Sequence, residues 1–313
     1  MDVPGEPKDS ADPLRTGGGI RLEAEQEKGM KKLTAVGMTL LLCVLTAGGQ
    51  TAEKQEIELK YGPGLDEIFA VQAKIQDIHP FLKKLYPVAI LESDRFYIFE
   101  PDPEKKSFIL AGDVPVPMEI TGKLRAALGL EYEGGKIVCA VSGEVFDSLA
   151  GYVDIFHEFI HCRQWEAGEQ NLKMELSVAR SAMAKQDFMW ELNHPFPYHD
   201  PQFTEIYSLF LDALDNQKPQ IVWNCRRFLR EILNTQDFEY MIWAEWKEGF
   251  ARLIENRIKI KLGLGENRGG REEPFSRVSF YAGGEGLIQL LVQEDPDFLE
   301  DLEGLFHGML QIY

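Results

Sequence analysis

The spacing of apolar residues changes along the chain and divides it into two parts. Between residues 64 and 86 apolar side chains recur every three or four positions, which predicts an amphipathic helix that Pro87 ends. Short runs rich in β-branched and aromatic residues follow, separated by Pro, Asp and Gly, and they predict strands over 95–100, 107–111 and 136–142. We therefore expect a small sheet in the first part.

Beyond Gly143 the spacing is helical almost throughout. Long amphipathic segments are predicted over 145–168, 171–192, 202–216, 219–234, 237–262, 284–294 and 297–311, with breaks at 194–198 and 263–274. No internal repeat or obvious linker interrupts the pattern. We expect an α+β fold with one domain over 50–313, in which a small mixed lobe with a short sheet (50–143) packs on a mainly helical lobe (144–313).

The start of the chain has the layout of an export signal. Met30-Lys-Lys precedes the apolar run 33–45, and Ala47 and Gly49 are the small residues expected before a cleavage site. We expect a signal peptide over 30–49 that starts at Met30, a disordered polar extension over 1–29, and a periplasmic or secreted mature protein.

Two other interpretations of this segment stay open. The apolar run could be an uncleaved anchor, although it is short for a membrane span. Cys43 could be a lipidation site, although Leu42 stands where a lipobox needs a small residue. After cleavage we expect no stable membrane span.

Composition narrows the classes of function. The chain has 313 residues, of which 44% are hydrophobic, enough for a sizeable core, and its formal net charge of −18 leaves no basic field for a phosphate backbone. We therefore expect no nucleic-acid partner. The 4 cysteines form no CxxC pair. Cys139 and Cys225 could pair in an oxidising compartment, and Cys162 is expected to be a small buried hydrophobe.

One motif carries specific chemistry: His157-Glu158-Phe159-Ile160-His161. Side chains four apart on a helix share a face, so two imidazoles can bind one zinc ion. The intervening Glu158 can take a proton from a metal-bound water that attacks a carbonyl carbon. Asp154 and Arg163 stand where stricter versions of this motif have uncharged and hydrophobic residues.

A catalytic zinc usually has three protein ligands, so a third one is needed. On the predicted 237–262 helix, the charged residues Glu245, Glu248, Arg252 and Glu255 share a face. Such a face is usually solvated, but Gly249 and Ala251 beside Glu248 are small and favour close approach to the His157 helix. Glu248 is the preferred ligand, with Glu245 and Glu191 as rivals and a surface ion pair with Arg252 as the alternative.

At this point the chain resembles the gluzincin group of zinc metallopeptidases. The resemblance rests on the HEFIH motif and the later Glu248-Gly-Phe-Ala251, and it covers about 151–255. It implies a zincin-like helical lobe, with His157, His161 and Glu248 as metal ligands and Glu158 as general base. The thermolysin type has an acidic residue four positions after the ligand Glu, where this chain has Arg252. Glu245 is our preferred candidate for orienting a ligand histidine.

An oxyanion forms during such a reaction and needs a hydrogen-bond donor. Arg277 and Tyr281, between a Gly-rich loop and a helix, are the preferred catalytic candidates. His194, Tyr198 and His199 compete for the role, and all of these side chains could instead be packing or surface groups.

The sequence thus predicts an exported zinc-dependent peptidase acting on peptides or proteins. The alternatives are a zinc hydrolase acting on another amide, such as a cell-wall component, and a non-catalytic binding protein on a peptidase scaffold. The intact motif with its Glu158 argues against the last of these.

Overall fold

The computed structural model describes the backbone of residues 34–116, 120 and 122–311, and within these ranges the side chains from residue 52 onward. The predicted extension 1–29 and the first residues of the predicted signal peptide lie outside the described residues. The chain divides into two compact units, Met1–Thr51 and Ala52–Tyr313, and the second contains the sheet and every candidate site residue. Within the part of the chain that is described, no helix has the length and apolarity to cross a bilayer.

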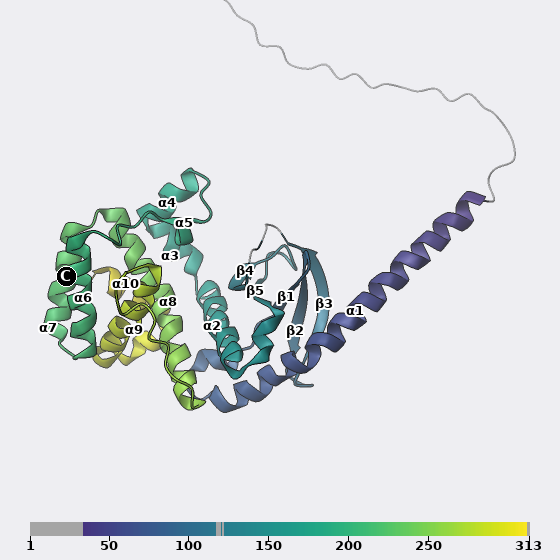
Figure 1. The fold of residues 1–313 in the computed structure, drawn as a ribbon, viewed down its shortest axis with the longest axis horizontal. Helices are drawn as coiled ribbons and strands as arrows, with labels where there is room; N and C mark the ends of the chain where they lie inside the picture. Colours follow the sequence, from purple (N-terminus) through teal and green to yellow (C-terminus); the bar gives the residue numbers. More distant parts are fainter. Residues whose placement is uncertain (1–33, 117–119, 121, 312–313) are drawn as a thin grey trace, which may run out of the picture. The chain divides into compact units, whose positions relative to one another are not determined.

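The sheet has five strands in the order β3-β2-β1-β5-β4 (Figure 1). Their bounds are β1 Val88–Glu92, β2 Arg95–Asp102, β3 Ser107–Pro115, β4 Arg125–Gly129 and β5 Ile137–Ser142. The β1–β5 pair is parallel and the other pairs are antiparallel. β4 is therefore an edge strand whose outer side pairs with no other described strand.

Two of these strands, β1 and β4, were not predicted from the sequence. β1 reads as a continuous apolar run without the alternation that marks a half-buried strand, because it lies inside the sheet. β4, Arg-Ala-Ala-Leu-Gly, lacks the β-branched and aromatic residues that favour strands, and its pairing with β5 imposes the extended conformation. The three predicted strands are confirmed.

The helices follow the predicted segments with four corrections. α1 (Thr34–Ile75) begins 30 residues before the predicted start at 64 and ends before residue 86, and a 3-10 turn, η1 (Pro80–Lys83), capped by His79, follows it. The predicted 297–311 helix is divided into a 3-10 turn, η3 (Pro296–Leu299), and α10 (Leu302–Gln311). The 171–192 segment is broken into α3 (Glu169–Glu175), α4 (Ser177–Ala184) and α5 (Trp190–Asn193). α9 (Arg277–Glu294) begins seven residues before the predicted 284, because Ser276 and Ser279 form a capping box.

The remaining helical elements keep close to their predicted bounds. They are η2 Gly143–Asp147, α2 Leu149–Glu166, α6 Pro201–Asp215, α7 Pro219–Ile232 and α8 Thr235–Lys261. The α+β class with a small sheet lobe and a helical lobe is confirmed.

One core joins the sheet to the helices. Alternate sheet residues such as Val88, Phe99 and Val141 face the same apolar cluster as Phe156 of α2 and Trp246 of α8. The opposite face of the sheet packs on a smaller cluster that includes Phe96 and Ile98. α2 therefore lies between the sheet and α8, with the histidine motif at the junction (Figure 1).

Candidate metal centre

The two motif histidines and Glu248 meet where α2 and α8 pack together. The Nε2 atoms of His157 and His161 are 3.1 Å apart. The Glu248 Oε2 atom lies 3.3 Å from His161 Nε2 and 3.7 Å from His157 Nε2. Four ligands placed tetrahedrally at zinc distances are about 3.3 Å from one another, so these separations suit a single ion. The three side chains are a group that could hold a metal ion.

Hydrogen bonds on the far side of each imidazole fix which nitrogen faces this point. His157 Nδ1–H donates to the Glu255 carboxylate at 2.9 Å. His161 Nδ1–H donates to the Gln164 side-chain oxygen at 2.7 Å, and the Gln164 amide donates in turn to the Lys247 carbonyl at 3.0 Å. With the proton on Nδ1, each neutral ring presents the lone pair of Nε2. In this neutral form of both rings, two lone pairs and a carboxylate oxygen face one another, so either a proton on one Nε2 atom or a metal ion must lie between them.

The pKa shifts of His157 and Glu248 indicate that this cluster favours an added positive charge. Burial lowers the pKa of His157, but contacts with the Glu248 and Glu255 carboxylates outweigh it and raise the pKa to about 10. Burial opposes ionisation of Glu248 as well, yet His161, His157 and Arg277 hold its pKa well below the usual range. A metal ion would supply the charge that a proton otherwise supplies.

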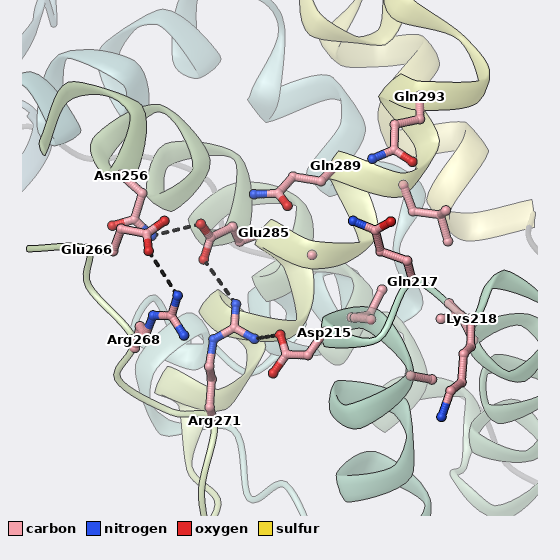
Figure 2. Close-up of a pocket in the computed structure, with 15 residues that line it drawn as sticks. Asp215, Gln217, Lys218, Asn256, Glu266, Arg268, Arg271, Glu285, Gln289 and Gln293 are labelled. Atoms are coloured by element: carbon pink, nitrogen blue, oxygen red, sulfur yellow. Dashed lines mark hydrogen bonds and ion pairs between the residues drawn. The ribbon is translucent and has the colours of Figure 1, made fainter. Parts of the chain in front are cut away.

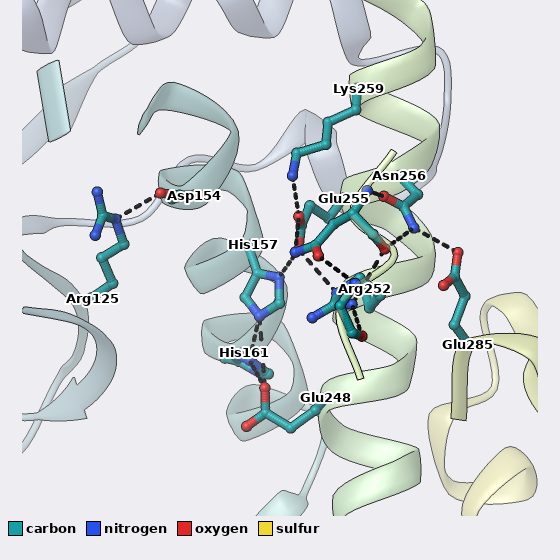
Figure 3. Close-up of polar contacts among 12 residues, drawn as sticks. Arg125, Asp154, His157, His161, Glu248, Arg252, Glu255, Asn256, Lys259 and Glu285 are labelled. Carbon is teal, nitrogen blue, oxygen red and sulfur yellow. Dashed lines mark hydrogen bonds and ion pairs between the residues drawn. The ribbon is translucent and has the colours of Figure 1, made fainter. Parts of the chain in front are cut away.

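Glu255 takes the orienting role that we predicted for Glu245. Glu255 lies two turns after Glu248 on α8 and so projects from the same face, toward His157 (Figure 3). Its other oxygen accepts from Lys259 at 2.6 Å and from the Asn267 amide at 3.0 Å, which locks the carboxylate. The prediction for Glu245 was wrong because spacing on a helix does not say which turn reaches the partner helix.

The rival ligands lie elsewhere. Glu245 is fully buried and pairs with Arg226 at 2.7 Å, while Tyr207 donates to it at 3.0 Å. Glu191 lies in an ion-pair cluster with Lys173 and Lys247, at 2.6 and 2.9 Å. Neither belongs to the metal group. Arg252 does not pair with Glu248; it donates to the carbonyls of Asn267 and Gly269, at 3.3 and 3.2 Å.

The charged face of α8 is buried, contrary to the usual pattern for such a face. Glu245, Glu248, Arg252 and Glu255 are each exposed by 7% or less. Gly249 also has a different neighbour from the one predicted: a Cβ atom there would come within 2.5 Å of the Gly284 backbone in α9. The small residue permits close packing of α8 on α9 rather than on α2.

A cleft of about 620 Å³ opens beside His157, His161 and Glu248. It is lined by β4, by α2, by the α3–α5 segment, by Lys247 and Glu248 of α8, and by Arg277 and Tyr281 of α9. Glu158 also lines the cleft, is 8% exposed, and its carboxylate makes no hydrogen bond to any described residue. That carboxylate is available to a molecule in the cleft.

Arg277 and Tyr281 both reach this cleft. Arg277 donates to the Glu248 Oε1 atom at 2.7 Å and to the Tyr281 hydroxyl oxygen. Burial raises the pKa of Tyr281, so its hydroxyl keeps its proton at neutral pH. The competitors lie outside the cleft lining: His194 pairs with Asp237 at 2.7 Å, and Tyr198 packs on Phe280. His199 is exposed and also outside the lining.

The two departures from the stricter motif have structural reasons. Asp154 forms an ion pair of 2.7 Å with Arg125 at the start of β4, which ties the edge strand to the metal helix. The Arg163 guanidinium lies over the Phe81 ring, 5.0 Å from its centre. In the sequence Glu255 was recognised only as one of four charged residues on a shared helix face. Gln164 was not predicted as a partner of His161, and the only signal for Arg125 was the unusual charge of Asp154.

The cysteines have no part in the site. Cys139, Cys162 and Cys225 are buried and free, so the pairing of Cys139 with Cys225 does not occur among the described residues. Burial raises the pKa of the Cys139 and Cys162 thiols well above the usual value, as for inert core residues. Cys162 is the buried hydrophobe that we predicted.

In comparisons with known proteins, no protein-family model, no curated protein and no solved structure matches this chain.

Proposed function

We propose that the protein is an exported zinc-dependent peptidase of gluzincin type. The observation that carries the proposal is the convergence of two imidazole lone pairs and one carboxylate at the edge of a cleft into which Glu158 also faces. A site with three protein ligands and an open side is the arrangement of catalytic zinc, whereas structural zinc is enclosed by four.

We propose zinc as the metal. Two imidazoles and one carboxylate disfavour Mg²⁺ and Ca²⁺, which prefer oxygen ligands throughout, but the same set can also hold Fe²⁺. The His-Glu-x-x-His spacing, with Glu158 beside the first ligand, favours zinc over Fe²⁺. When bound, zinc would lower the pKa of a water molecule and polarise a substrate carbonyl. His157, His161 and Glu248 would hold it.

The protein's own residues supply the remaining steps. Glu158 would accept the proton of the attacking water and pass it to the leaving amine. Arg277 and Tyr281 stand on the other side of Glu248 and would donate hydrogen bonds to the oxygen on which negative charge develops. Glu255 and Gln164 keep the imidazoles in the tautomer that presents Nε2.

The edge strand favours a peptide as substrate. Residues 123–129, which contain β4, line the cleft opposite the α3–α5 segment, and the outer side of β4 pairs with no described strand. An extended peptide can add to such an edge through main-chain hydrogen bonds. We therefore favour a peptide over a cell-wall amide.

A pair of substitutions tests the proposal. Glu158→Gln should keep the metal and lower peptide cleavage by about 100-fold or more, because the amide cannot accept a proton. His157→Ala should lose both the metal and peptide cleavage. The matched control is His307→Ala, a histidine that pairs with Glu175 at the surface, outside the cleft lining, and should keep both metal and activity.

Metal content by mass spectrometry and cleavage of a peptide library with and without chelator are the measurements. A Glu158→Gln protein with full activity would exclude the general-base role. Cleavage of cell-wall amides but of no peptide would exclude peptides as the substrate. The proposal for the metal site would not be affected.

A further inference from the structure

A second cavity lies away from the metal cleft and shares no lining residue with it. It has a volume of about 210 Å³ and lies between the α6–α7 turn, the loop 266–271, Asn256 of α8 and the middle of α9 (Figure 2). Its lining is strongly polar and includes Asp215, Glu266, Arg268, Arg271 and Glu285. Such a concentration of charge in a concave site is what a polar ligand needs.

The floor of this cavity is a buried, hydrogen-bonded carboxyl group. Glu285 is 3% exposed and accepts from the Asn256 amide at 2.7 Å. Burial raises the pKa of Glu285, and the contacts with Asn256 and Arg271 offset this effect only in part. The ionised carboxylate is therefore not fully stabilised by its neighbours. The nearest cation, Arg271, stays 3.8 Å from it. A positively charged group entering the cavity would meet a carboxylate that is short of positive partners.

The cavity wall beside Glu285 also carries two guanidinium groups with hydrogen-bonding capacity for a new partner (Figure 2). Arg271 forms an ion pair with Asp215, and its Nε atom is buried without a hydrogen-bond partner among the described residues. The Arg268 side chain is 74% exposed, and its ion pair is with its loop neighbour Glu266, at 3.0 Å. Exposed pairs of this kind contribute little stability, so Arg268 can turn toward an anion at small cost.

The charges of the cavity wall set the charge of its ligand. Three acidic residues (Asp215, Glu266 and Glu285) face three basic ones (Lys218, Arg268 and Arg271). These charges largely pair with one another, Asp215 with Arg271 and Glu266 with Arg268. Glu285, 3.8 Å from its nearest cation, and the unpartnered Arg271 Nε atom keep hydrogen-bonding capacity of opposite polarity, so a ligand with both an ammonium group and a carboxylate can satisfy both. Side-chain amides of Gln217, Gln289 and Gln293 complete the wall (Figure 2) and can hydrogen-bond a peptide-like group.

We propose that this cavity binds a small zwitterion, a free amino acid or a dipeptide. Its ammonium group contacts Glu285 at the floor and its carboxylate contacts Arg271 and Arg268. The volume supports the size, because a cavity of about 150 Å³ holds the six carbon atoms of benzene and about 210 Å³ therefore holds roughly eight non-hydrogen atoms, close to the size of a free amino acid or a small dipeptide. The proposal does not depend on the metal centre.

Glycylglycine is the probe, and titration calorimetry on the metal-free full chain is the measurement. We expect saturable binding with one site per chain and a dissociation constant of about 1 mM or tighter. N-Acetylglycine, which lacks the ammonium group, and glycinamide, which lacks the carboxylate, should each bind at least about tenfold more weakly.

Three variants assign the binding to this cavity. Arg271→Gln and Glu285→Gln should each weaken glycylglycine binding at least about tenfold, and Glu285→Gln retains an acceptor for Asn256 and so protects the fold. Arg227→Gln, on the exposed face of α7 and hydrogen-bonded to Asn224, is the control and should bind normally. A far-UV spectrum and a melting curve check that each variant is folded.

Three results would overturn the proposal. They are the absence of binding up to about 10 mM, binding that Arg271→Gln and Glu285→Gln leave unchanged, and N-acetylglycine binding as tightly as glycylglycine. Loss of peptidase activity in a His157→Ala protein bears on the proposed function alone, because that residue does not line this cavity.

Discussion

At the scale of single residues, three glutamates on one helix have three different roles. Glu248 faces the two histidines, Glu255 accepts from His157, and Glu245 pairs with Arg226 in the core. All three are buried, and the sequence favoured Glu248 only through its small neighbours Gly249 and Ala251, of which Gly249 packs on α9 rather than on α2. What distinguishes them is the neighbour that each α8 turn meets.

These roles predict an order of metal affinity. Glu248→Ala should weaken zinc binding by more than about 100-fold because a ligand is lost, and Glu255→Ala by about 10- to 100-fold because His157 loses its orienting partner. Glu245→Gln should bind zinc normally but lower the free energy of unfolding by about 3 kcal/mol, because Arg226 then lacks a countercharge. Chelator competition and chemical denaturation measure the two quantities. A larger loss of zinc in Glu245→Gln than in Glu248→Ala would refute the assignment.

At the scale of elements, the contact between α8 and α9 positions both Glu248 and Arg277. The two helices approach until their backbones touch: a Cβ atom at Gly284 would lie 2.1 Å from the Glu245 carbonyl oxygen. Glu248 on one helix and Arg277 on the other then come within 2.7 Å. Close packing at the glycines thus sets the distance between the proposed metal ligand Glu248 and the proposed oxyanion donors.

Gly284→Ala should therefore separate the two helices. Overpacking of this kind costs about 1–3 kcal/mol of unfolding free energy. The control is Gly265→Ala in the loop after α8, where no described atom outside the neighbouring residues lies within 4 Å of the added Cβ, and stability should be unchanged or rise by about 0.4–1 kcal/mol. Urea denaturation compares them. Equal stability of Gly284→Ala and the wild type would show that the helices are not held at contact distance.

At the scale of the whole molecule, His79 connects segments that are far apart in sequence. Its Nδ1 atom accepts from the Phe81 amide at 3.2 Å, so the proton is on Nε2, which donates to the Leu299 carbonyl at 2.9 Å. The neutral ring thus ties η1, after the first helix, to η3, before the last. Burial lowers the pKa of His79 to about 4.

This pKa predicts an acid-sensitive fold. The unfolded chain takes up the His79 proton near pH 6.5 and the folded protein only near pH 4, so the unfolded state binds more protons in between. The contribution is full above about pH 6.5 and is lost as the pH falls toward 4, by at most about 3 kcal/mol. His79→Asn keeps hydrogen-bonding groups without this titration. Its unfolding free energy, measured by urea at several pH values, should fall less than that of the wild type over this range.

The features that depend only on neighbours along the chain could be predicted from the amino-acid sequence. The i, i+4 spacing of His157 and His161 placed both imidazoles on one helix face, and the apolar periodicity gave three of the five strands and most helix bounds. The class of fold followed from the order of these elements. None of this required knowledge of a distant contact.

Tertiary contacts determine which of several residues of the same type come together in the folded chain. Glu248 rather than Glu245 or Glu191 faces the histidines, and Glu255 holds His157, because α8 crosses α2 at that turn. β4 is a strand because β5 pairs with it. Arg125 of β4 forms the ion pair with Asp154. Such contacts join residues up to about a hundred positions apart, and local propensity carries no information about them because their energy comes from packing that exists only in the folded chain.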